Sequence, residues 1–329
     1  MSNKNKVEDI LSVFLMNVQG LTVHKWNEWQ EMIEKNNSKI KVSMFTETQH
    51  KIEKVFFGDN YKYEVGMRGE HDKKGGGLMI GSNDEVSIVK VESGNVDVLC
   101  VDVEVRKSKM RVILTYWDVR DSHRNDRIVT CIRGMVERYE GKLMVLGDMN
   151  AHLGFLGQQE LNRNGVKLLN LMEECGLVLL NLDEACRGEI TREEGGHKSV
   201  IDFVLVNVLL YDDFLKMDID ERKELFDLSD HCMIRVDFRI GVKGSDERVQ
   251  KRIEYYRVKD DMKEMFLQKI EEKLVRMNED EQECVFHDAV TRVCEEVLKR
   301  TRVVRGNPNE NEWESVWMNE EIRLSLIHI

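Results

Sequence analysis

Short apolar runs recur between residues 11 and 240, and their spacing is the feature that most constrains the fold. Many runs are rich in valine and isoleucine, with polar or helical segments between them, which predicts strands alternating with helices and loops. The predicted strands are Leu11–Met16, Val42–Thr46, Leu78–Gly81, Val86–Val91, Val96–Val105, Arg111–Tyr116, Leu143–Leu146, Leu177–Leu182, Ile201–Val206 and Ile234–Ile240. Trp26, Trp29 and Ile33 would share one face of a helix, and a second helix would follow Asn164-Gly165.

The pattern changes after about residue 241. The stretch Gly241-Val-Lys-Gly244-Ser-Asp predicts a linker, because glycine and small polar residues interrupt regular structure. Beyond it, apolar residues step by four within 262–274 and again within 285–297. This spacing predicts two charged amphipathic helices and no strand.

The composition is that of a globular protein. With 329 residues and 41% hydrophobic content, the chain can bury a sizeable core. No apolar run approaches the roughly 20 residues that cross a bilayer, and no signal-peptide core follows Met1. The seven cysteines form no Cys-x-x-Cys pair, which disfavours a zinc site or a disulfide framework. We therefore expect an intracellular protein that is not secreted and has no membrane partner.

The net charge of −12 argues, at first sight, against a nucleic-acid partner. The argument is weak, because metal-dependent nucleases concentrate carboxylates in their sites. Acidic helices elsewhere in the chain also add to the total, and a local basic rim can coexist with it.

The stretch Leu143-Met-Val-Leu-Gly-Asp148-Met-Asn150 carries the strongest functional indication. An apolar run that ends in Gly-Asp-x-Asn predicts a buried strand with two polar side chains just past its end. A carboxylate there can bind a metal or orient a water, and the amide can donate to a phosphate oxygen. The alternative is a polar turn, since Asp and Asn favour turns.

Further polar groups stand at other predicted strand ends. Asn17 and Glu47 end two strands near the N-terminus, Asp202 begins a later one, and Asp230-His231 precedes the last. Each alone also fits a solvated residue that flanks a strand. Taken together and in this order, they are a more specific indication of a site than any one of them.

This order resembles that of the endonuclease/exonuclease/phosphatase superfamily. The succession is Asn-x-x-Gly-Leu, Glu-Thr, Tyr, Gly-Asp-x-Asn, Ile-Asp-Phe-Val-Leu and Ser-Asp-His, and it covers roughly residues 10–240. In particular, the chain resembles the endonuclease domains of non-LTR (LINE-type) retrotransposons and their craniofacial development protein 2-like relatives. The stretches that carry this likeness are Gly75-Gly-Gly-Leu-Met-Ile80, Asn164-Gly165-x-x-Leu-Leu169 and Gly176-Leu-Val-Leu-Leu-Asn181.

The resemblance implies an α/β (α+β) four-layer sandwich, in which helices flank two central mixed β-sheets and the site lies at the sheet edges. It implies one Mg²⁺ ion, or Mn²⁺ in its place, with Glu47 as principal ligand and Asn17 and Asp230 contributing. The implied catalytic residues are Asp148, Asn150, His231, Asp202 and Tyr116, of which Asn150, Tyr116 and His231 would also bind substrate.

By resemblance, Asp148 would orient or deprotonate the attacking water and Asn150 would donate to the scissile phosphate. His231 would contact a non-bridging oxygen, with Asp202 fixing its tautomer, and Tyr116 would position the phosphate or stabilise the leaving group. Spacing does not decide whether Asp148 or His231 is the base. We favour Asp148, because a histidine beside two aspartates can be cationic.

The chain departs from the family pattern near two of these residues. Trp117 follows Tyr116 where a proline usually comes soon after, and Val119 lies where a polar phosphate contact is common. Arg192 follows Thr191 where retrotransposon endonucleases usually have an aromatic residue. Downstream, His123-Arg124-Asn125 is interpreted as a solvated loop, with phosphate contacts as the alternative.

The function implied is a metal-dependent DNA endonuclease that nicks target DNA to prime reverse transcription, in the nucleus. One alternative is a phosphodiesterase or phosphatase of the same fold acting on RNA, lipid or inositol phosphates. The other is a domesticated, non-catalytic chromatin-associated interaction module.

The C-terminal residues bear on the domain boundaries. Trp313-Glu-Ser-Val-Trp317 resembles the segment that precedes the reverse transcriptase in such elements, so we expect fusion to one in the full-length protein. Residues 324–329 match the translation of a widely used sequencing adaptor and would be an artefact. We therefore predict an endonuclease/exonuclease/phosphatase domain at 1–240, a helical extension at 241–323 and adaptor sequence at 324–329.

Overall fold

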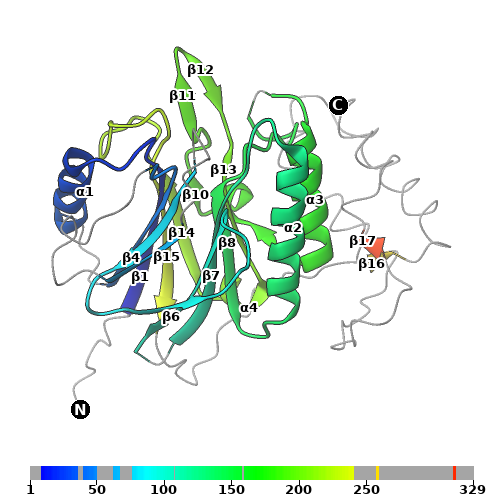
Figure 1. Ribbon diagram of the computed structural model, residues 1–329, viewed down its shortest axis with the longest axis horizontal. Helices are drawn as coiled ribbons and strands as arrows, with labels where there is room; N and C mark the ends of the chain where they lie inside the picture. Colours follow the sequence, from blue (N-terminus) through cyan, green and yellow to red (C-terminus); the bar gives the residue numbers. More distant parts are fainter. Residues whose placement is uncertain are drawn as a thin grey trace. The chain divides into compact units, whose positions relative to one another are not determined.

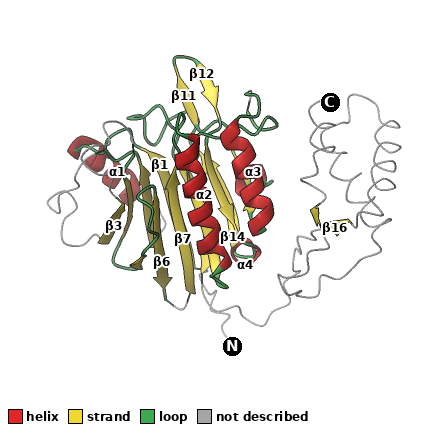
Figure 2. Cartoon of the chain, turned by 45° about the vertical axis from the view of Figure 1, so that its right-hand side comes forward, coloured by secondary structure: helices red, strands yellow, loops and turns green. Residues whose placement is uncertain are grey.

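Two mixed β-sheets pack face to face in the computed structural model, and helices lie on both outer faces (Figures 1 and 2). The strand order is β10-β14-β15-β1-β2-β4-β3 in the seven-stranded sheet and β5-β6-β7-β8-β13-β9 in the six-stranded sheet. Helix α1 covers the first sheet, and α2 and α3 cover the second (Figure 1). The four-layer sandwich predicted from the sequence is confirmed.

The structure describes residues 9–35, 40–49, 62–66, 76–106, 108–157, 159–240, 257–258 and 314–315. The chain divides into two compact units, Met1–Lys251 and Arg252–Ile329. In the described part of the second unit, β16 (Arg257–Val258) pairs with β17 (Glu314–Ser315), where the sequence predicted no strand. The predicted linker, both amphipathic helices and the last six residues lie outside the described ranges.

The strands of the seven-stranded sheet are β1 (Asp9–Asn17), β2 (Ile40–Thr46), β3 (Lys62–Gly66), β4 (Leu78–Ser82), β10 (Cys186–Arg187), β14 (Phe214–Ile219) and β15 (Ile234–Ile240). Those of the six-stranded sheet are β5 (Ser87–Val91), β6 (Val98–Val105), β7 (Ser108–Tyr116), β8 (Lys142–Asp148), β9 (Val178–Leu179) and β13 (Asp202–Val206). The other elements are the hairpin β11 (Arg192–Glu194) and β12 (His197–Ser199), the helices α1 (Val23–Lys35), α2 (Ser122–Glu137), α3 (Arg163–Cys175) and α4 (Val208–Tyr211), and a 3₁₀ turn at Leu180–Leu182.

The central strands are apolar on both faces because each sheet has a covered layer on either side. In β1, Leu11, Val13 and Leu15 enter the core between the sheets, whereas Phe14 and Met16 pack under α1. Side chains alternate between the faces of a strand, so a strand buried on both sides appears in the sequence as an uninterrupted apolar run. This is why such runs predicted the central strands well.

Helix α1 packs through its tryptophans, as predicted. Trp29 is fully buried, its ring lies 4.7 Å from that of Phe45 between centroids, and its indole N–H donates to Ser43 Oγ at 3.0 Å. Trp26 is also buried, and Ile33 is partly buried against the same cluster. These tryptophans are therefore core residues.

Several elements differ from the sequence prediction. The predicted strand Leu177–Leu182 is a strand only at Val178–Leu179, after which the chain forms a 3₁₀ turn. The interpretation of His123-Arg124-Asn125 as a solvated loop is wrong, because these residues form the first turn of α2 and Asn125 is fully buried. In the first unit, the described strands that were not predicted are β3, β10, β11, β12 and β14. Among the described residues, no helix is long and apolar enough to cross a membrane.

Gly147 explains why a glycine precedes the aspartate of the Gly-Asp-x-Asn motif. Its φ is +143°, and a Cβ there would lie 1.9 Å from the carbonyl oxygen of Thr115 on β7. Only glycine allows the backbones of β7 and β8 to approach this closely. We expect Gly147→Ala to lower the free energy of unfolding by about 3 kcal/mol, because the strands must separate.

Denaturant unfolding measures this effect, and Gly94→Ala is its control. Gly94 also has a positive φ, +70°, but a Cβ there would meet nothing within 4 Å. The Gly94→Ala variant should therefore lose only about 1 kcal/mol of unfolding free energy, which is the cost of a positive φ in a residue that has a Cβ. Equal losses in the two variants would mean that the contact with Thr115 has no energetic weight.

Candidate active site

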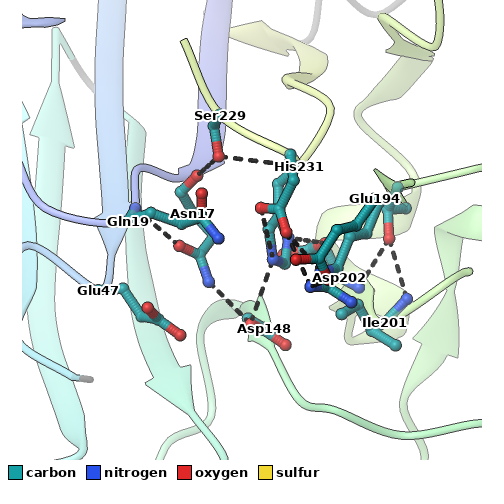
Figure 3. A network of polar contacts seen from close by, with 12 residues as sticks. Asn17, Gln19, Glu47, Asp148, Glu194, Ile201, Asp202, Ser229 and His231 are labelled. Carbon is teal, nitrogen blue, oxygen red and sulfur yellow. Dashed lines mark hydrogen bonds and ion pairs between the residues drawn. The ribbon is translucent and has the colours of Figure 1, made fainter. Parts of the chain in front are cut away.

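Five of the residues predicted to form the site come from both sheets and meet at one edge of the sandwich (Figure 3): Asn17, Glu47, Asp148, Asp202 and His231. Asn17 ends β1, and Glu47 directly follows the neighbouring parallel strand β2. Asp148 ends β8, in register with Tyr116 at the end of β7 and with Asp202 at the start of β13. The packing of the two sheets thus brings together side chains that are far apart in the chain.

Asp148 lies at the centre of this group and is almost fully buried, with 1% of its surface exposed. Its Oδ2 accepts from Asn17 Nδ2 at 2.8 Å, and its Oδ1 accepts from the backbone N–H of Asn150 at 3.1 Å. Burial and then the nearby Asp202 carboxylate raise the pKa of Asp148 to about 7, against the lowering effect of His231 and Asn17. A bound divalent cation would lower it again.

His231 precedes β15 and is directed at Asp148 by a second carboxylate. Its Nδ1 lies 2.7 Å from Asp202 Oδ2, and because a carboxylate only accepts, Nδ1 carries the hydrogen. Its Nε2 lies 3.8 Å from Asp148 Oδ2 and 3.8 Å from Asp230 Oδ1. Burial opposes a charged ring, but Asp202, Asp148 and Asp230 together raise the pKa of His231 to about 9. The imidazole is therefore cationic at neutral pH.

The three residues predicted to bind metal approach this centre from different sides. The amide of Asn17 bonds to Asp148, and the Glu47 carboxylate points toward the same two residues (Figure 3). Glu47 has a φ of +53°, and its carbonyl accepts from the N–H of Gly20 at 2.7 Å. Asp230 Oδ1, which lies 3.8 Å from the same ring nitrogen of His231 as Asp148 does, is buried and has no hydrogen-bond partner.

These donors fit a hard divalent cation. Carboxylate and amide oxygens are the ligands that Mg²⁺ prefers, and an unpartnered buried carboxylate oxygen is costly unless a cation or water meets it. Among the described residues, Asp148, Asp202 and His231 also offer ligand atoms that lie within 4.8 Å of one another. In that group the Nδ1 of His231 and one oxygen of Asp202 are already bonded to each other, so it makes a less open metal site.

Asn150 and the loop after Tyr116 lie beside Asp148. Asn150 has a φ of +45°, and its Nδ2 donates to the carbonyl of Trp117 at 2.8 Å, which leaves its second amide hydrogen for another acceptor. Trp117 is fully buried, and its backbone N–H donates to the carbonyl of Asp148 at 2.9 Å. Trp117, near the position where family members usually have a proline, is therefore a core residue. Val119, two residues later, is 71% exposed.

Sequence reasoning missed two contacts that order the site. Arg192, which stands where retrotransposon endonucleases usually have an aromatic residue, donates through Nε to Asp230 Oδ2 at 2.9 Å. This bond fixes one of the two carboxylate oxygens of Asp230. Ser229 Oγ donates to the carbonyl of Asn17 at 2.7 Å and accepts from the N–H of His231 at 3.2 Å, which joins two site segments. The Ser-Asp-His motif indicated Ser229, but no sequence pattern pairs Arg192 with Asp230.

The sequence and the fold of this chain are similar to those of known proteins. Residues 110–235 match the family described as “Endonuclease-reverse transcriptase”. A search of curated protein sequences gives no significant match. The endonuclease domain of TRAS1, a telomere-specific non-LTR retrotransposon, is similar with a TM-score of 0.58 and 18% identity, over 70% of this chain and 98% of that one.

Two further solved structures share the fold. The AP endonuclease LMAP from Leishmania major has a TM-score of 0.57 and 11% identity, over 71% of this chain and 89% of that one. A 3′ phosphatase from Neisseria, bound to a product DNA hairpin, has a TM-score of 0.52 and 16% identity, over 70% of this chain and 99% of that one. Residues 110–235 thus match this family, and the chain shares the fold of these endonucleases and phosphatases, which is the family that the order of its strand-end groups resembles.

Proposed function

We propose that this chain is a Mg²⁺-dependent DNA endonuclease that nicks target DNA to prime reverse transcription. The observation that carries the proposal is the buried Asp148, which contacts Asn17 and faces the Nε2 of a His231 ring bonded to Asp202. Phosphodiester hydrolysis needs an oriented water, neutralisation of the phosphate oxygens and help for the leaving oxygen. The chain offers separate groups for these tasks.

Asp148 is the group proposed to orient and deprotonate the water. It is an acceptor on both oxygens, and its raised pKa is close to neutral, where a general base works well. His231 is cationic and therefore suits a non-bridging phosphate oxygen better than a proton-accepting role. Asp202 acts through His231, by fixing its tautomer and supporting its charge, and so is a positioning residue.

The substrate phosphate would bind between these groups and the neighbouring loop. The free amide hydrogen of Asn150 donates to the scissile phosphate, and the Tyr116 hydroxyl, at the end of β7, positions it or stabilises the leaving 3′ oxygen. Glu47, Asn17 and Asp230 would hold Mg²⁺, or Mn²⁺ in its place. When bound, the ion supplies positive charge to the phosphate and the leaving oxygen.

Charge explains why a cation is needed here. Asp148, Asp202 and Asp230 surround one histidine, and the whole chain has a net charge of −12. A polyanion such as DNA would be repelled from this cluster unless a divalent ion offset part of its charge.

The likeness to the TRAS1 endonuclease and the description of the matching family support the retrotransposon context. In that context the full-length protein is fused to a reverse transcriptase and acts in the nucleus. A phosphatase or phosphodiesterase that acts on another phosphoester is the second candidate, because a 3′ phosphatase shares the fold.

Nicking of supercoiled plasmid tests the proposal. We expect nicked circles with Mg²⁺ or Mn²⁺ and none with EDTA, because the site carboxylates need the cation. Asp148→Ala and His231→Ala should abolish nicking, and circular dichroism would show that both variants remain folded. Equal nicking by the variants would contradict the assigned site. Release of phosphate from RNA, inositol or lipid substrates without DNA nicking would favour the second candidate.

A further inference from the structure

Three buried or half-buried asparagines surround the loops that carry the site. Asn125 lies in the first turn of α2, Asn162 is the N-cap of α3, and Asn164 follows in its first turn. Asn164 is 7% exposed and Asn125 is fully buried. We call these three residues the asparagine network. None of them belongs to the set of site residues described above.

The network bonds to the backbone rather than to the reacting groups. Asn125 Nδ2 donates to the carbonyl of Asp118 at 2.7 Å and to Asn164 Oδ1 at 2.9 Å, while Asn125 Oδ1 accepts from the N–H of Asp118 at 2.9 Å. Asn164 Nδ2 reaches the carbonyls of Met149 at 3.3 Å and Asn150 at 3.2 Å. The first turns of two helices thus bind the two loops that follow β7 and β8.

Asn150 is the residue that most needs this support. Its φ of +45° is in the left-handed region, which a residue other than glycine adopts at a cost. Its carbonyl accepts from Asn162 Nδ2 at 3.0 Å as well as from Asn164 Nδ2. Two donors on this one carbonyl stabilise the conformation that lets the Asn150 side chain bond to Trp117.

Asn162 has two separable roles. Its Oδ1 accepts from the N–H of Gly165 at 2.7 Å, which caps α3, and from the N–H of His152 at 3.0 Å. Its Nδ2 donates to Asn150. Helix and loop are also in close contact, because a Cβ at Gly165 would lie 2.0 Å from the carbonyl of His152.

We propose that Asn162 and Asn164 are positioning residues that fix the backbone of Asn150 and so aim its free amide hydrogen at the substrate phosphate. The functional part of this inference rests on the proposed nuclease activity. Misplacement of one contacting group by about 1 Å can lower a rate about 100-fold. The network should therefore influence turnover more than DNA affinity, because it acts on the backbone of Asn150.

Asn162→Asp separates the two roles of Asn162. The carboxylate keeps both acceptor bonds and remains a favourable N-cap, but it cannot donate to Asn150. Asn162→Ser, which also retains a capping oxygen, is a second variant for the case that a charge disturbs the loop. The matched control is Asn207→Asp. Asn207 caps α4, accepts from the N–H of Leu143 at 3.0 Å and donates to the carbonyl of Gly141 at 2.8 Å, at the opposite end of β8.

We expect Asn162→Asp and Asn162→Ser to lower kcat for nicking about 10- to 100-fold with little change in KM, while Asn207→Asp retains wild-type kcat. In an Asn150→Ala background, Asn162→Asp should lower kcat no further, because the side chain it positions is gone. A purely structural role would instead give the same loss in both backgrounds. Similar kcat in all three variants, or additive losses, would overturn the inference.

Hydrogen exchange provides a second readout that needs no catalysis. The N–H of Asn150, which donates to Asp148, should exchange several-fold faster in Asn162→Asp than in the wild type and be unchanged in Asn207→Asp. Unchanged exchange at residues 149–151 would overturn the positioning role. If the wild type nicks no DNA, the proposed function fails, and faster exchange in Asn162→Asp would still support the positioning of Asn150.

Discussion

Asp148→Asn should lower the rate of DNA nicking about 1000-fold while leaving the protein folded. The amide has the shape of the carboxylate but cannot take a proton from the attacking water. Nicking at saturating Mg²⁺ and DNA measures kcat, and thermal unfolding in EDTA measures stability. The substitution should thus lower the nicking rate without a comparable loss of stability.

The stability of Asp148→Asn should stay within about 1 kcal/mol of the wild type, because two effects oppose each other. Removal of a buried charge beside Asp202 is favourable, as the raised pKa of Asp148 indicates. However, Asn17 and Asn150 both donate to this side chain, and an amide can accept from only one of them.

Asp237→Asn is the matched control for Asp148→Asn. Asp237 is also buried, with 2% of its surface exposed, and it accepts from Ser12 Oγ at 2.7 Å and from Arg235. This variant should lose stability, since it weakens a charge-assisted pair, and retain full nicking activity when folded. If Asp148→Asn kept wild-type activity, Asp148 would not be the base, and His231 would become the candidate.

The sequence predicts a strand well when both of its faces are buried, and poorly when one face carries charges. In β14, Met217 and Ile219 enter the core, whereas Lys216 and Asp218 form an ion pair on the other face. Apolar and charged residues alternate only from Lys216 to Ile219, which is too short a segment to stand out as an apolar run. The strands of the hairpin, β11 and β12, consist of polar and charged residues, so pairing rather than an apolar pattern determines them.

The residues of the site also differ in how well the sequence predicts them. Asn17, Asp148 and Asp202 could be predicted because each stands at a strand end, and the packing of the two sheets brings these strand ends together at one edge of the sandwich. The bonds of Arg192 to Asp230 and of Asn162 to Asn150 join different turns, and they depend on packing that no local pattern encodes. A single sequence therefore predicts the reacting groups better than the residues that orient them.

Asp202→Asn should lower kcat about 1000-fold without changing the Mg²⁺ concentration needed for half-maximal nicking. Asp202 Oδ2 accepts the Nδ1 hydrogen of His231 at 2.7 Å, and an amide there could stabilise the wrong tautomer and would not support a charged ring. His231→Ala should cause a comparable loss. In the double variant the loss should be close to that of either single change, because the two residues act as one unit.

Glu47→Gln is the counterpart that separates this unit from the metal site. Glu47 lies outside the cluster of Asp148, Asp202 and His231 and is the proposed principal metal ligand. Its substitution by glutamine should therefore raise the Mg²⁺ concentration needed for half-maximal nicking several-fold. Titration of Mn²⁺ followed by electron paramagnetic resonance measures the same affinity without turnover. If Asp202→Asn weakened Mn²⁺ binding and Glu47→Gln did not, the buried cluster itself would be the metal site. The histidine would then be a ligand rather than a cation that binds the phosphate.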